Sequence, residues 1–309
     1  MNRFSIRAAL GLTSWLIFAV DARSASAFCQ ATTCDPGTTL CPTDAQGCFA
    51  TGKPLSWWSS CVTVSVQADG APLQHITFEN AEASVTRAFA AWTSAPCSGG
   101  LPSITVNVQG PISCDASEYN ADRGNANIVV FREDSWPYTG GQDALGLTRI
   151  HFDPDTGEIY DSDIEVNAVD EPLTIGDPKP GAVDLDSLLT HEAGHLLGLA
   201  HNTHDTTATM YPGYVKGSID LRSLAADDIA GLCSIYPHSR QASSSSCDAR
   251  HGYSDLCGAD QPEPPPAEDP APSSSSCSLH PGSQTNRDSA AFLALFAALF
   301  VARKRRPGR

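Results

Sequence analysis

Short stretches in which apolar and polar residues alternate predict several strands in the first half of the chain. These stretches are residues 61–67 and 103–108, and an apolar run at 127–131 has the length of a further, more fully buried strand. One helix is predicted at 79–95, where apolar side chains recur at helical spacing and share a face: Val85, Ala88, Phe89 and Trp92. This order of elements favours an α/β (α+β) layout with helices packed on a mainly parallel, twisted sheet.

A second helix is predicted to begin near Asp184, because aspartate is a favoured N-cap residue. Leu185, Leu188 and Leu189 then face the core at helical spacing. A final helix carries paired aspartates at 227–228 near its start, where the helix dipole favours negative charge.

The second predicted helix contains the segment HEAGHLLGLAH at 191–201. His191 and His195 are four residues apart and project from one helix face. Gly198 can end the helix, because glycine tolerates a positive φ, and the chain can then bring His201 back to the same point. Three histidines leave one tetrahedral position of a zinc ion open, as in catalytic sites. Glu192 lies beside the first ligand and can take a proton from the water that attacks a substrate.

Two other interpretations of this segment are a helix with surface histidines and an inactive relative that kept its metal ligands. The additional glycine and third histidine make a chance match rare. The presence of Glu192 argues against the inactive relative.

The N-terminus has the features of a secretory signal peptide at 1–27. Arg3 and Arg7 precede an apolar run at 8–20, and small residues at 25–27 offer a cleavage site, so the mature chain is expected to begin at Phe28. The apolar run is too short to cross a bilayer comfortably.

Eleven cysteines in an exported chain predict disulfides. Cys97 and Cys114 flank the predicted strand at 103–108 and could pair with each other. Leaving Cys277 aside, ten cysteines remain, with room for five bridges. A zinc cluster of the early cysteines is the alternative, but their irregular spacing and the predicted export count against it.

Composition divides the chain into a cysteine-rich lead-in at 28–52, a globular domain at 53–238, a linker at 239–288 and a tail at 289–309. The linker is rich in serine, proline and acidic residues, so we expect it to bury too little apolar surface to fold. The tail has an apolar run followed by an arginine cluster. The net charge of −16 argues against nucleic-acid binding, and we predict no oligomer.

The long form HExxHxxGxxH is the metzincin signature, which requires a methionine turn further along the chain. Met210 follows His201 and is the only methionine besides Met1. The sequence at 210–214, MYPGY, together with LAADDIAGLCSIYP at 224–237 and the helix pattern at 81–95, resembles the matrixins, over about residues 53–238.

This resemblance implies the metzincin zincin fold: a mostly parallel five-stranded sheet with three helices and one catalytic zinc in the active-site cleft. It also implies proteolysis, with a protein or peptide substrate extended along an edge strand near residues 144–150. Tyr214 and the stretch after Met210 would line the pocket for the substrate residue that follows the scissile bond. The aspartates at 227–228 would brace that turn and the N-terminal region.

The chain departs from the matrixin pattern in two respects. We find no cysteine-switch motif and no room for a normal prodomain before the domain. The second, structural zinc site also looks lost, because Arg149 and Asp163 stand where histidines are expected, and His151 nearby is interpreted as a surface residue. An acidic run could instead bind Ca²⁺ through oxygen ligands, or be a solvated loop: Asp153, Asp155, Glu158, Asp161 and Asp163.

The C-terminal tail resembles the sorting tails of myxobacterial surface proteins, which are removed near a cysteine, here Cys277. This implies tail-processing machinery as a partner, and a location that is secreted or on the outer surface of a Gram-negative bacterium. Two functions follow from the sequence. The favoured one is a secreted or surface zinc endopeptidase. The alternative is a surface binding or adhesion protein that keeps the metal site with little turnover.

Overall fold

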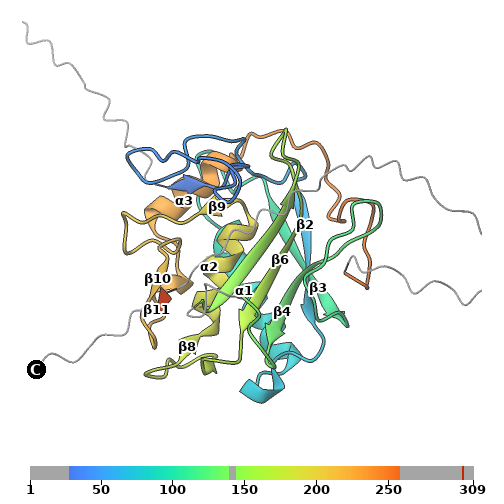
Figure 1. Cartoon of the computed structure of the whole chain (residues 1–309), viewed down its shortest axis with the longest axis vertical. Helices are drawn as coiled ribbons and strands as arrows, with labels where there is room; N and C mark the ends of the chain where they lie inside the picture. The colour runs from blue at the N-terminus through green and yellow to red at the C-terminus, as the bar shows by residue number, and fades with distance from the viewer. Residues whose placement is uncertain (1–27, 139–143, 258–300, 303–309) are drawn as a thin grey trace, which may run out of the picture.

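The computed structural model describes residues 28–138, 144–257 and 301–302 (Figure 1). The predicted signal peptide, the predicted linker beyond residue 257, Cys277 and nearly all of the predicted tail lie outside the described residues. No helix within the described ranges has both the length and the apolar content to cross a membrane.

A five-stranded sheet in the order β3-β2-β4-β6-β5 forms the centre of the fold. Its strands are β2 (Cys61–Gln67), β3 (Thr105–Ile112), β4 (Asn127–Arg132), β5 (Gly146–Phe152) and β6 (Ile159–Asn167). All neighbours pair in parallel except β5, which runs antiparallel to β6 at the edge of the sheet. The expectation of a mostly parallel five-stranded sheet is confirmed.

Short strands hold the connecting segments together in pairs. These are β1 (Cys29–Gln30) with β9 (Leu199–Ala200), β7 (Leu173–Thr174) with β8 (Val183–Asp184), and β10 (Gly213–Tyr214) with β11 (Val301–Ala302). The β1–β9 pair is antiparallel, so the lead-in lies against the segment that follows the HEAGH helix.

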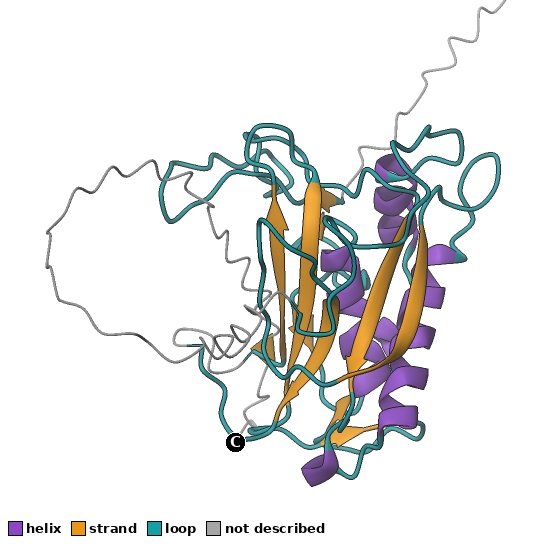
Figure 2. Cartoon of the chain, turned by 90° about the vertical axis from the view of Figure 1, so that its right-hand side faces the viewer, coloured by secondary structure: helices purple, strands orange, loops and turns teal. Residues whose placement is uncertain are grey.

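Three α-helices are described: α1 (Phe78–Thr93), α2 (Leu185–Leu196) and α3 (Ala226–Ile235). Two short 3-10 turns accompany them, at Pro72–Gln74 and Asp220–Arg222. Helices α1 and α2 pack together against the sheet, and Figure 2 shows helices gathered on one face of it. We call this the inner face and the opposite one the outer face.

Local signals and one buried indole fix the two inner helices. The Asp184 side chain accepts a hydrogen bond from Ser187 N at 2.8 Å, which confirms the predicted N-cap of α2. Trp92 of α1 is fully buried, and its Nε1 donates to Thr190 O of α2 at 2.8 Å. Burying such a side chain contributes about 2–3 kcal/mol, and the hydrogen bond sets how α1 lies against α2.

Segments without regular structure cover the outer face, and residues 239–257 are among them. Thr63 N donates to Cys247 O at 3.0 Å, and Arg240 donates to the carbonyls of Trp57 and Ser59, both at 2.8 Å. The expectation that the serine-rich segment cannot fold is therefore wrong for residues 239–257. Hydrogen bonds and two disulfides hold residues 239–257 in place. In the rest of the fold, burial of apolar side chains has this stabilising role.

Ten cysteines form five disulfides in the described residues, as their number predicted. The pairs are Cys29 with Cys48, Cys34 with Cys41, Cys61 with Cys247, Cys97 with Cys233, and Cys114 with Cys257. The expected pairing of Cys97 with Cys114 is wrong. The strand between them, β3, extends over roughly 25 Å, which puts its flanks far beyond disulfide reach. The early cysteines form disulfides rather than a zinc cluster.

Candidate metal centre and active site

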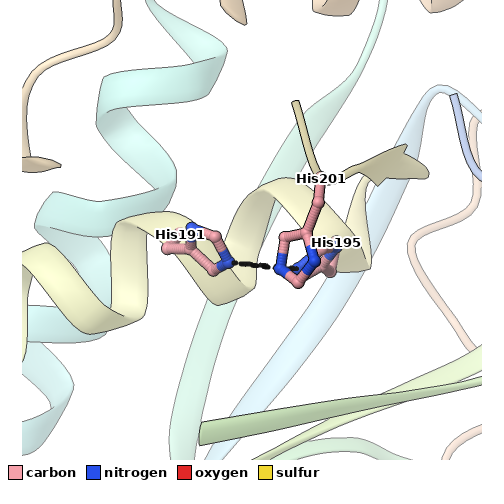
Figure 3. Close-up of side chains that lie close together, drawn as sticks. All are labelled: His191, His195 and His201. Atoms are coloured by element: carbon pink, nitrogen blue, oxygen red, sulfur yellow. Dashed lines mark hydrogen bonds between the residues drawn. The ribbon is translucent and has the colours of Figure 1, made fainter. Parts of the chain in front are cut away.

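Helix α2 and the segment after β9 bring three imidazole rings together (Figure 3). The Nε2 atoms of His191, His195 and His201 lie 3.2 Å from one another in each of the three pairs. The spacing of the motif therefore produces the convergence that it predicts. Within the described ranges, no other three side chains of histidine, cysteine, aspartate or glutamate converge in this way.

The turn that delivers His201 depends on Gly198. Its φ is 90°, and a Cβ at this position would lie 2.6 Å from Leu55 O. Ala31 N of the lead-in then donates to Gly198 O at 2.9 Å, next to the β1–β9 pair. Both the predicted helix end and the lead-in thus hold the segment that carries the third histidine.

Backbone carbonyls fix the tautomers of the two helical histidines. His191 Nδ1 lies 2.6 Å from Thr209 O, and His195 Nδ1 lies 2.9 Å from Leu199 O. A carbonyl oxygen only accepts, so each Nδ1 carries the proton and each Nε2 presents a lone pair. The short Nε2 to Nε2 contact between these two rings is therefore not a hydrogen bond in the neutral state.

Burial keeps the three rings neutral. It lowers the pKa of His195 to about 4 and the pKa values of His191 and His201 well below the ordinary histidine range. Neutral nitrogens with converging lone pairs repel one another unless a cation lies between them. The donor set, with its carbonyl-held Nδ1 atoms, suits a zinc ion with an open fourth position.

Glu192 is fully buried beside this centre. Thr148 of β5 donates a hydrogen bond from Oγ1 to Glu192 Oε2 at 2.7 Å, whereas Oε1 has no hydrogen-bond partner. Burial raises the pKa of Glu192 to about 8, and the Thr148 hydrogen bond opposes this shift. The hydrogen bonds thus distinguish the two oxygens: Oε2 is held by Thr148, and Oε1 is buried without a partner. The sequence motif identified Glu192 but gave no signal for Thr148, which is distant in the chain.

The methionine turn contacts the histidine centre, since Thr209 O lies 2.6 Å from His191 Nδ1. Buried Asp228 accepts hydrogen bonds from Thr209 N at 2.7 Å and Met210 N at 3.0 Å, as the resemblance implied for the turn. Asp227 accepts from Asn202 Nδ2 at 2.7 Å. These contacts connect the start of α3 to both the turn and the residue after His201.

A glycine inside the motif allows this close approach, and sequence reasoning missed its role. A Cβ on Gly194 would overlap Met210 Sδ and would lie 2.7 Å from the Trp92 ring. Only glycine leaves room for both side chains against α2.

The acidic run is divided between two environments. Asp153 lies on a turn, where it accepts from Tyr160 Oη at 2.6 Å and Asp155 N at 2.8 Å. Asp161 and Asp163 are instead fully buried on the outer face. The run therefore does not gather into one cluster.

His151 is not the surface residue that we expected. It is 8% exposed and stacks on Tyr119, with ring centroids 4.5 Å apart. Burial lowers its pKa to about 4. The segment at 113–125, whose path the sequence pattern did not reveal, covers it.

A three-histidine centre on a helix and its following turn, above a methionine turn and beside an antiparallel edge strand, defines a metzincin-type protein. The matrixin family model matches residues 56–237, and the chain belongs to the matrixin family.

Curated relatives agree with this assignment. The chain is 30% identical to metalloendoproteinase 1-MMP of Arabidopsis thaliana over 63% of its own length and 48% of that protein. It is 27% identical to metalloendoproteinase 1 of Glycine max, over 58% of this chain and 52% of that protein. It is 34% identical to human matrilysin over 37% of this chain and 41% of that protein. The chain thus spans about half the length of the curated relatives it matches.

Proposed function

We propose that this protein is a secreted or cell-surface zinc endopeptidase. The observation that carries the proposal is the convergence of three neutral Nε2 atoms beside a buried glutamate with one unpartnered oxygen. His191, His195 and His201 would hold a single zinc ion, which supplies a Lewis acid that lowers the pKa of water and polarises a carbonyl group.

Glu192 performs the proton transfers in this proposal. Its Oε1 accepts a proton from the water that attacks the peptide carbonyl, and the carboxylic acid then donates it to the leaving amine. The hydrogen bonds from His191 and His195 to backbone carbonyls hold both rings in the tautomer that binds metal.

Strand β5 is the proposed docking edge for a protein or peptide substrate. It is the last strand of the sheet and pairs only with β6 among the described strands, so its other edge offers backbone groups to an extended peptide. Tyr214, which follows the methionine turn, would form part of the pocket for the substrate residue after the scissile bond. Its hydroxyl donates to Ser218 O at 2.6 Å and accepts from Asp184 N at 2.9 Å, which fixes this wall.

The disulfides support an extracellular location for the proposed enzyme. Five disulfides are typical of proteins that fold in an oxidising compartment. We extend the proposal to removal of the signal peptide, location on the outer surface of a Gram-negative bacterium or release from it, and tail processing near Cys277.

Calcium binding at the acidic run is a separate proposal. The buried carboxylate of Asp161, which has no hydrogen-bond partner on either oxygen, is the observation that supports it. The division of the run between a turn and the outer face limits such a site to its buried members, Asp161 and Asp163.

The test uses the oxidised, zinc-loaded full chain and a library of denatured proteins and peptides. We expect cleavage by the wild type, and Glu192→Gln to lower kcat by about 10²- to 10⁴-fold because the proton acceptor is lost. Zinc content should stay at one per chain, since the three histidines are intact. Equal cleavage by Glu192→Gln would overturn the mechanism. A zinc-loaded wild type that binds peptides but cleaves none would favour the binding protein instead.

A further inference from the structure

Two residues of strand β5, Gly146 and Thr148, contact the carboxylate of Glu192 from the same side. They are two positions apart in the strand, so they share its inner face. Neither belongs to the HEAGH motif or to the methionine turn. Each acts on a different oxygen of the glutamate.

Thr148 holds Oε2. Its hydroxyl has a single proton and lies 2.7 Å from Glu192 Oε2 but 3.2 Å from the Glu192 backbone carbonyl oxygen, so the shorter contact to the carboxylate takes the proton. Thr148 is 1% exposed, which keeps solvent from competing for that hydroxyl. A β-branched side chain also has few χ1 states, so the donor itself is well fixed.

Gly146 leaves space beside Oε1. A Cβ at this position would lie 2.7 Å from Oε1 and 3.0 Å from Cδ of Glu192. The φ of Gly146 is not in the left-handed region, so the need for glycine here arises from space rather than backbone conformation. Any side chain at 146 would push the carboxylate away or cover the oxygen that has no partner.

We propose that Thr148 is a positioning residue that fixes Glu192 so that Oε1 is the proton-accepting oxygen, and that Gly146 leaves space beside this buried oxygen. The inference rests on the proposed endopeptidase function. It also means that β5 has two roles: its free edge receives the substrate backbone, while its inner face orients the group that moves the proton. A substrate seated on β5 is thereby placed relative to Glu192 by the same strand.

The first test compares Thr148→Val with Thr148→Ser in the zinc-loaded full chain. Valine keeps the branched shape without the donor, and we expect kcat to fall by about 10- to 100-fold with KM changed less than about threefold, because orientation is lost while substrate docking is kept. Serine keeps the hydroxyl and should recover most of kcat. Thr105→Val is the control, since this threonine donates to Ser60 O at 3.1 Å on β3, at the opposite edge of the sheet from β5.

Zinc content and the thermal midpoint are measured for every variant, so that loss of metal or fold is recognised. If Thr148→Val does not accumulate as folded protein, Thr148→Ala carries the same expectation. Wild-type kcat in Thr148→Val, or a serine variant as slow as the valine variant, would overturn the inference. Failure of the wild type to cleave any peptide would instead overturn the proposed function.

Gly146→Ala tests the second half of the inference. We expect a loss of kcat at least as large as that of Thr148→Val, with one zinc per chain retained, because the added methyl group lies against Oε1. Gly110→Ala is the control, as a Cβ at this position of β3 meets no atom within 4 Å. A Gly146→Ala protein with unchanged kcat would show that Oε1 is not the working oxygen.

Discussion

The two faces of the β5–β6 pair contain buried polar groups in very different settings. On the inner face, Thr148 contacts Glu192 beside three converging histidines. On the outer face, the next residue, Arg149, lies 3.6 Å from Glu165. Both faces hold carboxylate oxygens without hydrogen-bond partners, Glu192 Oε1 on one and Asp161 on the other. An orphaned buried oxygen therefore does not by itself distinguish an active site, whereas convergence of metal-ligating nitrogens does.

The buried carboxyl groups of the outer face are stabilised by ion pairs, by hydrogen bonds or by protonation. Arg132 forms an ion pair with Glu165 at 2.5 Å, and Tyr138 also hydrogen-bonds to this carboxylate. Asp163 accepts from Ser117 Oγ at 2.7 Å and Ile128 N at 3.0 Å. Burial and the neighbouring Asp163 raise the pKa of Asp161 well above the ordinary range. The inner face instead has the nitrogen lone pairs of three histidines, which suit a metal cation, and the unpartnered Oε1 of Glu192, which suits a proton.

The largest difference between the faces should appear on removal of zinc. A zinc-selective chelator such as 1,10-phenanthroline should reduce cleavage to background and lower the thermal midpoint, because the metal binds only the folded centre. Added zinc should restore both. Midpoint and activity that do not respond to the chelator would contradict the assignment of the inner face as the metal centre.

A smaller effect, on stability alone, is expected for Glu165→Gln on the outer face. Loss of this carboxylate leaves Arg132 and Arg149 without their buried partner, and we expect a cost of about 3 kcal/mol in urea unfolding. The kcat of the folded fraction should stay within about twofold of the wild type. Glu118→Gln, at an exposed position, is the control and should change neither quantity. A loss of kcat in Glu165→Gln without a loss of stability would show that the outer face affects catalysis on the inner face.

The smallest effect is expected for Asp161→Asn, and it should depend on pH. The folded-state pKa is raised, so folding is favoured by the protonated form, and this stability is lost as the pH rises above the ordinary carboxyl range. Asparagine avoids that loss and should raise the free energy of unfolding by about 1 kcal/mol at pH 8 and by little at pH 4.5. Exposed Asp155→Asn serves as the control.

The wild type and Asp161→Asn can also be compared in the presence of Ca²⁺, which tests whether the outer face binds this ion. If millimolar Ca²⁺ raises the thermal midpoint of the wild type but not of Asp161→Asn, the outer face is a cation site as well. The two faces would then differ in the cation that each binds, calcium on the outer face and zinc on the inner face.

Local signals made much of this molecule predictable. Asp184, the four-residue spacing of His191 and His195, and Gly198 each act within one or two helical turns, so the sequence alone placed them. Thr148 and Gly146 could not be found in this way. Their role depends on the register of an edge strand against a helix, and Thr148 and Glu192 are 44 positions apart in the sequence.

The wrong expectations share a physical cause. Cys97 and Cys114 are close in sequence, but the extended strand between them separates their side chains. The neighbours of His151 in the chain, and the composition of residues 239–257, predict exposure. Their burial is decided instead by distant segments that fold over the outer face, where two disulfides hold residues that composition alone assigns to a linker.

The stretch shared with matrixins ends at residue 237, whereas the stapled structure continues to 257. A protein cut at the family boundary would keep Cys61 and Cys114 and lose both of their partners, Cys247 and Cys257. In an oxidising compartment such thiols attack other disulfides and scramble them. The family match and the disulfide-linked structure thus cover different lengths of chain, and we expect recombinant preparation to need the longer one.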